Sequence, residues 1–287
     1  MRKRNQIEPA LIANTENGTH PFFSPDGESV GFFTGRELKR VSLSGGPAQT
    51  LLATTYRYGA SWGPDNTIVF ASTDAPGLMR VSDSGGESHP LTSPESGEVH
   101  RWPEFLPDGK AVLFTIAQEG GLAILNGKIA VLSLETGECH PLVDGADAHY
   151  ASSGHLIFGR EASLWAVPFD VRRLEITGDP KPVAENVQVN SGGWAHYDLA
   201  NDGSLIYLSG TSSIATLNLV WADREGKEKV IAAPPDNYNN PMISPDGMQV
   251  ALDITSNEGN ADIWVWDLLR ESKTRLTFDE GTDTIPI

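Results

Sequence analysis

The sequence predicts an all-β protein, a six-bladed β-propeller built from four-stranded antiparallel blades. Three observations support this prediction. A turn motif returns along the chain, β-rich segments follow it in the same order each time, and no convincing amphipathic helix interrupts them. A period of roughly 40–50 residues is typical of propeller blades with four strands each.

The turn motif is Ser24-Pro25-Asp26-Gly27, and it returns unchanged at residues 244–247. Looser copies begin at four further positions: Gly63, Leu106, Ala151 and Ala200. Successive copies therefore start 39, 43, 45, 49 and 44 residues apart. Pro presets φ at the first turn position, Asp accepts hydrogen bonds within the turn, and Gly tolerates positive φ. We assign a structural role to the motif carboxylates, which are Asp26, Asp65, Asp108, Asp202 and Asp246.

Each of the six units predicts four strands. Apolar first strands precede the turn, as at residues 21–23, 103–105 and 241–243. Second strands follow it at residues 29–33, 67–71, 111–116, 155–159, 204–208 and 249–254. Third strands are expected at residues 38–43, 78–82, 129–134, 163–169, 217–222 and 262–268. Fourth strands are expected at residues 49–52, 90–92, 141–143, 182–184, 229–232 and 274–277. Short strands with regular turn signals indicate an all-β fold.

The two ends leave a seven-bladed ring open as the alternative. Residues 10–14 have the pattern of a fourth strand, and residues 284–287 begin a further first strand. We expect these segments to pair within the molecule, because exposed strand edges otherwise favour self-association. Residues 1–287 are then one propeller domain, expected to be a fragment of a longer chain. The fourth unit should be irregular, since Ser153-Gly154 replaces Asp-Gly and the connection over residues 170–179 is long.

The composition limits the kinds of partner. The formal net charge is −17 and the isoelectric point is near 4.7, so nucleic acid and anionic membranes should be repelled. No apolar run is long enough to insert directly into a membrane, and no signal peptide is recognisable. Cys139 is the single cysteine, which excludes an internal disulfide. The sequence calls for no cofactor and leaves the compartment undetermined.

The repeats resemble the TolB-like, WD-repeat-like family of six-bladed propellers, whose repeat reads approximately Pro-x-Trp-Ser-Pro-Asp-Gly-x-x-Ile-x-Phe. The likeness covers residues 9–287. Residues 22–33, 59–70, 100–115 and 217–277 also resemble the repeat region that follows the kinase domain of many bacterial serine/threonine kinases. The resemblance implies a sensor or interaction module that binds a protein or a small polar ligand, in a parent protein that is membrane-anchored or periplasmic. The kinase motifs themselves do not occur in this sequence.

A candidate ligand site lies at the channel mouth, where the innermost strands of a propeller begin. Four residues before the turns stand His20, Gly59, Trp102, Asp147, His196 and Asn240. With their neighbours, these positions predict a ligand-binding set of His20, Arg57, His100, Arg101, Asp147, Trp194, His196 and Asn240. Two arginines should make this mouth locally less negative than the protein as a whole, which suits a hydroxyl-rich or carboxylate-bearing ligand.

Two other interpretations of these positions stay open. The positions could be polar only because a wet channel lines them. If they form the ligand pocket instead, replacing His20 and His196 with Ala should abolish binding at little cost in stability, because wet channel residues make few packing contacts. A metal could instead be held by His20, His100, His149 or His196 with Asp147. The resemblance adds weight here, because some TolB-like polysaccharide lyases carry a channel metal. Lyase or hydrolase chemistry is therefore the alternative to a non-catalytic binding module, although the histidines lack the spacing of a zinc motif.

Overall fold

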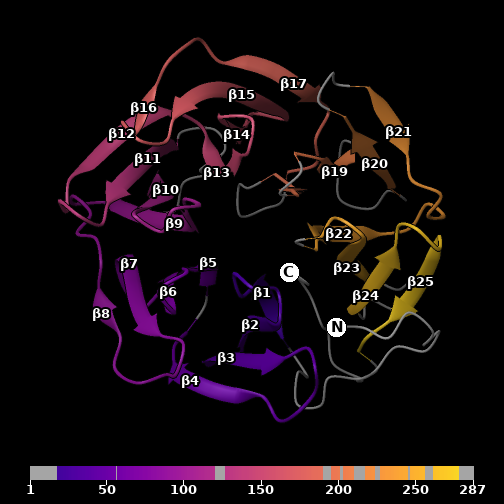
Figure 1. The fold of residues 1–287 in the computed structure, drawn as a ribbon, viewed down its shortest axis with the longest axis horizontal. Helices are drawn as coiled ribbons and strands as arrows, with labels where there is room; N and C mark the ends of the chain where they lie inside the picture. The colour runs from indigo at the N-terminus through magenta and orange to yellow at the C-terminus, as the bar shows by residue number, and fades with distance from the viewer. Residues whose placement is uncertain are drawn as a thin grey trace.

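The computed structural model describes residues 18–55, 57–119, 127–189, 195–200, 203–209, 217–223, 227–244, 246–255 and 261–277. These residues form six antiparallel sheets that are arranged as the blades of a ring (Figure 1). The described residues contain no helix and no seventh sheet. The all-β, six-bladed prediction is therefore confirmed.

The strands follow one another in chain order through the blades. Blade 1 contains β1 (Thr19–Phe23), β2 (Ser29–Thr34), β3 (Glu37–Ser42) and β4 (Gln49–Ala53). Blade 2 contains β5 (Arg57–Trp62), β6 (Thr67–Ser72), β7 (Ala75–Ser82) and β8 (His89–Pro90). Blade 3 contains β9 (Glu98–Phe105), β10 (Ala111–Gln118), β11 (Lys128–Ser133) and β12 (Cys139–Asp144).

The second half of the chain repeats this order. Blade 4 contains β13 (Ala146–Ala151), β14 (His155–Arg160), β15 (Ser163–Asp170), β16 (Glu175–Ile176) and β17 (Lys181–Glu185). Blade 5 contains β18 (Tyr197–Leu199), β19 (Leu205–Ser209), β20 (Asn218–Ala222) and β21 (Glu228–Val230). Blade 6 contains β22 (Tyr238–Ile243), β23 (Gln249–Thr255), β24 (Ala261–Asp267) and β25 (Ser272–Arg275).

The first strand of each blade lies nearest the axis, and the later strands follow outward (Figure 1). Blade 4 departs from this pattern, because β15 pairs with both β16 and β17. The extra strand β16 lies in the long connection that predicts an irregular fourth unit. Within the described residues, no helix is long and apolar enough to cross a membrane.

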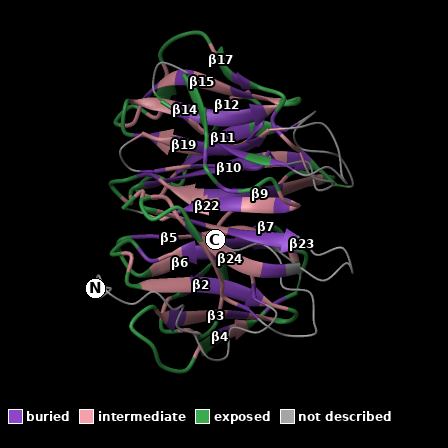
Figure 2. Cartoon of the chain, turned by 90° about the vertical axis from the view of Figure 1, so that its right-hand side faces the viewer, coloured by how far each residue is buried: buried purple, intermediate pink, exposed green. Residues whose placement is uncertain are grey.

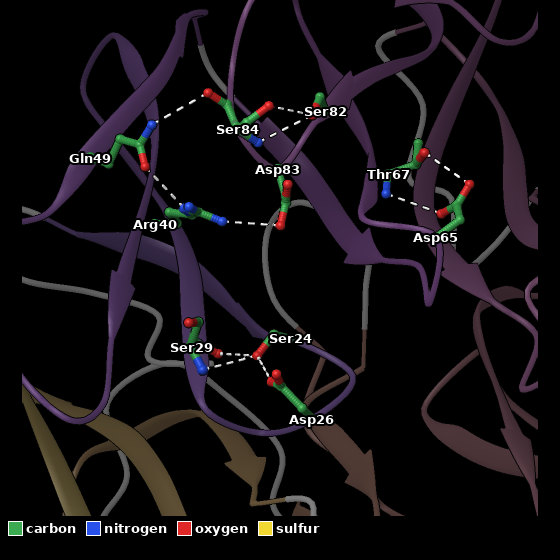
Figure 3. A network of polar contacts seen from close by, with 10 residues as sticks. All are labelled: Ser24, Asp26, Ser29, Arg40, Gln49, Asp65, Thr67, Ser82, Asp83 and Ser84. Atoms are coloured by element: carbon green, nitrogen blue, oxygen red, sulfur yellow. Dashed lines mark hydrogen bonds and ion pairs between the residues drawn. The ribbon is translucent and has the colours of Figure 1, made fainter.

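The turn motif folds as its residue types require. Asp26 accepts a hydrogen bond from the Glu28 N–H at 2.9 Å. Ser24 accepts one from the Ser29 N–H at 2.9 Å (Figure 3). Gly27 has φ of 68° and donates its N–H to the Ser24 carbonyl. Equivalent carboxylate contacts occur at Asp65, Asp108 and Asp246. These aspartates stabilise turns, and Asp202 lies outside the described residues.

The hydrophobic core is divided among the seams between consecutive blades. Figure 2 shows buried residues along the strands and exposed residues mainly at the turns. Clusters of buried side chains join blade 1 to 2, 2 to 3, 3 to 4, 4 to 5 and 5 to 6. Within the described residues, no such cluster joins blade 6 to blade 1. The expected closing segments, residues 10–14 and 284–287, lie outside the described residues, so their pairing stays a prediction.

Candidate ligand site in the central channel

A cavity of about 260 Å³ lies where the first strands of all six blades meet. The six positions that stand four residues before the turns all line it, namely His20, Gly59, Trp102, Asp147, His196 and Asn240. Equivalent places in six repeats have therefore been brought to one cavity at the propeller axis. The four of these residues that belong to the predicted ligand-binding set, His20, Asp147, His196 and Asn240, lie together in its lining.

A backbone irregularity recurs at this position. His20, Trp102, Asp147 and Asn240 have φ between 48° and 55°, and Gly59 has φ of 90°. The pairing of the first with the second strand shifts register at the same place in these five blades. A β-bulge of this kind re-aims a side chain and frees a backbone N–H from the ladder. The repeated bulge thus explains why this position is placed at the channel.

Ionisable groups gather on the side of the cavity formed by blades 3 to 5. We call this side the charged arc, and it consists of Glu104, Asp147, His149, Tyr197 and Asp198. The His149 Nδ1 lies 2.6 Å from a Glu104 carboxylate oxygen and 4.0 Å from one of Asp198. The His149 Nε2 lies 3.7 Å from Asp147. One imidazole therefore contacts three carboxylates from three blades.

Side chains two residues before the turn also tie neighbouring blades together. Glu104 accepts a hydrogen bond at 2.8 Å from the Tyr150 N–H of the next blade. Asp198 accepts one at 2.8 Å from the Ile243 N–H. Ser61 does the same for the Phe105 N–H at 3.0 Å. The charged arc is therefore part of the framework as well as part of the cavity lining.

The charged groups in this arc shift one another's pKa values. Burial alone would lower the pKa of His149, but the adjacent Glu104 and Asp147 carboxylates raise it well above 6.5. Burial raises the pKa of Asp198 to about 6, although His149 and two backbone N–H donors oppose that shift. At neutral pH, His149 is therefore an imidazolium among carboxylates.

The opposite side of the cavity is largely apolar. We call it the apolar arc, and it consists of Phe22, Phe23, Ala60, Trp62, Pro241 and Met242 from blades 6, 1 and 2. Phe22 and Trp62 pack edge to face, with ring centroids 6.2 Å apart. The cavity therefore has one charged side and one apolar side.

The histidines His20 and His196 are buried, with exposed fractions of 7% and 4%. The His196 Nδ1 accepts a hydrogen bond at 3.1 Å from the Asn240 N–H of the next blade. Burial lowers the pKa of His196 to about 4, so this ring is neutral at pH 7. His196 is therefore a buried, hydrogen-bonded residue and not a wet one, while the expected low stability cost of replacing the two histidines stays a prediction.

Four other predicted ligand-site residues do not stand in the described cavity lining. His100 is buried beside Phe114 and lies 2.7 Å from the Thr92 hydroxyl, and burial lowers its pKa to about 4. Arg101 is buried and stacks on Tyr58, with its guanidinium carbon 3.9 Å from the ring centroid. The side chain of Arg57 and the whole of Trp194 lie outside the described residues.

These placements change the expected electrostatics of the site. Without Arg101 in the lining, the described residues supply Glu104, Asp147 and Asp198 against His149. Arg101 therefore does not make the described part of the cavity less negative, and a contribution from Arg57 stays a prediction. Physically, the guanidinium packs against an aromatic ring between blades instead of facing the channel.

Sequence reasoning passed over Glu104, Tyr197 and Asp198. The available signal was the position two residues before the turn, where Phe22 and Met242 stand in other units. Carboxylates at a repeat position that is apolar in the first and last units indicate a special role for Glu104 and Asp198. Among the described residues, no group of three His, Cys, Asp or Glu side chains is arranged to hold a metal ion.

A larger hollow of about 480 Å³ lies between β17 and blade 5. Its lining includes Glu185, Tyr207 and Glu228, and the Tyr207 hydroxyl donates a hydrogen bond to Glu228 at 2.5 Å. Its described lining comes from two blades, whereas the described lining of the central cavity comes from all six.

Comparison with solved structures shows the same fold. TolB from Acinetobacter baumannii superposes with a TM-score of 0.67 at 19% identity, covering 93% of this chain and 65% of that one. An oligogalacturonate lyase in complex with manganese gives 0.63 at 15% identity, covering 90% and 76%. The gluconolactonase XC5397 from Xanthomonas campestris gives 0.64 at 15% identity, covering 88% and 86%.

These likenesses show a TolB-like six-bladed propeller and nothing finer, because binding proteins and enzymes both share it. This chain spans 65% of the length of the TolB chain. No protein-family model matches the sequence, and no characterised protein matches it in sequence.

Proposed function

We propose that this chain is a non-catalytic binding module whose central cavity takes a small polar ligand. The convergence of six equivalent first-strand positions on one cavity supports this function most strongly. Concave sites with a few converging polar groups on an otherwise apolar lining are typical of ligand pockets. A group of titratable side chains with shifted pKa values in such a pocket points the same way.

The contacts of the charged arc favour binding over catalysis. Glu104 holds both the His149 ring and the Tyr150 N–H, and Asp198 holds the Ile243 and Leu199 N–H groups. A general base needs a free lone pair within reach of the proton that it removes. These carboxylates already have partners, which suits an electrostatic role toward a bound molecule.

A fragment screen by saturation-transfer NMR tests this function, with small cationic, anionic and neutral molecules. We expect binding to the wild-type protein and loss of binding in Ala60→Phe, which places a ring in the cavity. The matched control is Ala53→Phe on the exposed outer strand β4. Binding that survives in Ala60→Phe, or no binding by any fragment, contradicts the proposed function.

In its parent protein, we infer that this propeller is the sensor-like region of a kinase-type protein and can also bind a protein partner. The likeness of residues 22–33, 59–70, 100–115 and 217–277 to kinase-associated repeats supports this. Sequencing the coding frame on both sides tests it, since a kinase domain should precede the repeats. A frame with no kinase domain contradicts this part of the proposal.

Lyase or hydrolase chemistry at the same cavity is the second candidate function. It is favoured by the short His149–Glu104 contact, because a carboxylate-oriented imidazole is a common acid–base arrangement. Incubation with oligogalacturonate and Mn²⁺, the substrate and metal named for one structural neighbour, tests this candidate. Product formation that is lost in His149→Gln supports the enzyme and contradicts the non-catalytic module.

A further inference from the structure

The described cavity lining carries an unbalanced charge. Glu104, Asp147 and Asp198 contribute three carboxylates, and His149 contributes one imidazolium. Among the lining residues that the structure describes, there is no Lys or Arg. Negative charges in a confined, poorly solvated space repel one another unless a cation joins them.

The nearest described arginine cannot supply this missing charge. The Arg101 guanidinium lies over the Tyr58 ring and is 5.9 Å from the centre of the Trp102 ring. The aromatic rings hold it between blades 2 and 3, outside the cavity lining. The described part of the cavity lining therefore has an excess of negative charge that a ligand could compensate.

The apolar arc adds a second requirement. Trp62 lines the cavity and is 7% exposed, yet its indole N–H has no hydrogen-bond partner in the described part of the chain. Asn240 also lines the cavity, and its buried Oδ1 has no hydrogen-bond partner in that part. An indole N–H can point at an aromatic face, and an amide oxygen accepts from an ammonium.

The size of the cavity restricts the ligand further. Its volume of about 260 Å³ lies below the range of roughly 300–1,000 Å³ that is usual for drug-sized ligands. A molecule with one charged head and one ring is of suitable size. The head belongs at the charged arc and the ring at the apolar arc.

We propose that the central cavity binds a small arylalkyl ammonium, whose cationic head meets Asp147 and its neighbouring carboxylates and whose ring packs on the apolar arc. This inference rests on the proposed binding function, and it names the ligand class. The carboxylates attract the ammonium, while Phe23, Trp62 and Met242 offer the ring an apolar surface.

Three probes of similar shape and different charge test the ligand class by calorimetric titration. They are 2-phenylethylammonium, the neutral 2-phenylethanol and the anionic 3-phenylpropanoate. We expect the cation to bind about tenfold more tightly than the alcohol, which corresponds to about 1.4 kcal/mol, and the anion not to bind. Equal or tighter binding of the alcohol or the anion overturns the proposal.

Asp147→Asn is the matching variant. Asparagine tolerates the left-handed conformation that Asp147 adopts, with φ of 55°. We expect it to weaken binding of the cation about tenfold and to leave binding of the alcohol unchanged. The control is Asp144→Asn, which removes the same charge from the exposed end of β12. If both variants weaken binding of the cation equally, the carboxylates act only through long-range attraction, which contradicts a binding site at Asp147.

Two further outcomes separate this inference from the proposed function. If Mn²⁺ binds in an Asp147-dependent way and 2-phenylethylammonium does not bind, the cavity takes an inorganic cation and the inference fails. If the fragment screen finds only neutral or anionic ligands, the inference fails while the binding function stands. The wild-type titrations decide between these results even where Asp147→Asn folds poorly.

Discussion

The two sides of the central cavity differ in how they hold the blades together. The charged arc joins blade 3 to blade 4 and blade 5 to blade 6 through carboxylates that accept backbone N–H groups of the next blade. The apolar arc joins blades 1 and 2 by packing of Phe22, which stands at the repeat position of Glu104 and Asp198, on Trp62. One repeat position therefore serves packing on one side of the ring and electrostatics on the other.

This difference shows how a repeat architecture acquires a site. The bulge before each turn repeats in five blades, so geometry brings the same position to the channel each time. What each blade presents there depends on single residues. Specialisation of three consecutive blades is enough to give the cavity a charged side without altering the fold.

The largest effect should come from breaking the charged arc. Glu104→Ala removes the nearest counter-charge of His149 and leaves the Tyr150 N–H without its partner, so we expect a loss of about 3–5 kcal/mol in the free energy of unfolding. Denaturant titration measures it. The double variant Glu104→Ala/His149→Ala should recover part of the loss. If Glu104→Ala lowers the free energy of unfolding no more than removal of an exposed carboxylate does, this expectation is wrong.

The backbone of the bulge gives the next effect. Gly59→Ala should lower the free energy of unfolding by about 1–3 kcal/mol. The φ of 90° at this position suits glycine, and an added Cβ would lie 3.1 Å from the Trp102 Cα. Gly35→Ala is the control, since nothing lies within 4 Å of its added Cβ. Equal thermal midpoints for the two variants would show that the bulge is not strained.

Acid should destabilise the protein between about pH 6 and pH 4, by about 1.4 kcal/mol for each pH unit. His100 and His196 have folded pKa values of about 4, below the unfolded value of 6.5, so unfolding takes up two protons. Asp198 acts oppositely, because its folded pKa of about 6 exceeds the unfolded value of 3.8. His149 is protonated in both states, and the net uptake is about one proton.

Unfolding titrations at several pH values measure this slope. His100→Asn removes one of the two histidine protons, so the slope should fall close to zero in that variant. Stability that rises on acidification, or an unchanged slope in His100→Asn, contradicts the assigned pKa shifts.

The smallest effect on stability should come from breaking a surface ion pair, although its length is similar to that of the His149–Glu104 contact. Lys110 and Glu135 approach to 2.8 Å, and both side chains are more than half exposed. Exposed pairs of this kind contribute little because water already solvates both charges. Glu135→Gln should therefore leave the denaturation midpoint unchanged, and a large shift would contradict the role given to burial at Glu104.

The repeats predict the fold more completely than the site. Pro, Asp and Gly at fixed offsets determine local turn geometry, and four strands per unit follow from them. The channel position of His20, Asp147, His196 and Asn240 follows from equal offsets as well. The orientation of Arg101 does not, because stacking on Tyr58 depends on a residue of another blade. The role of Asp198 likewise depends on the Ile243 N–H, which is 45 residues away.

The protonation states of His149 and His196 test most directly whether the carboxylates of the charged arc determine the charge in the cavity. His149 and His196 both line the cavity, and burial alone would keep both neutral. Long-range ¹H–¹⁵N correlation spectra of the histidine rings at pH 7, assigned with His149→Gln and His196→Gln, distinguish the two states. The account predicts an imidazolium at His149 and a neutral ring at His196, and a neutral ring at both positions would contradict it.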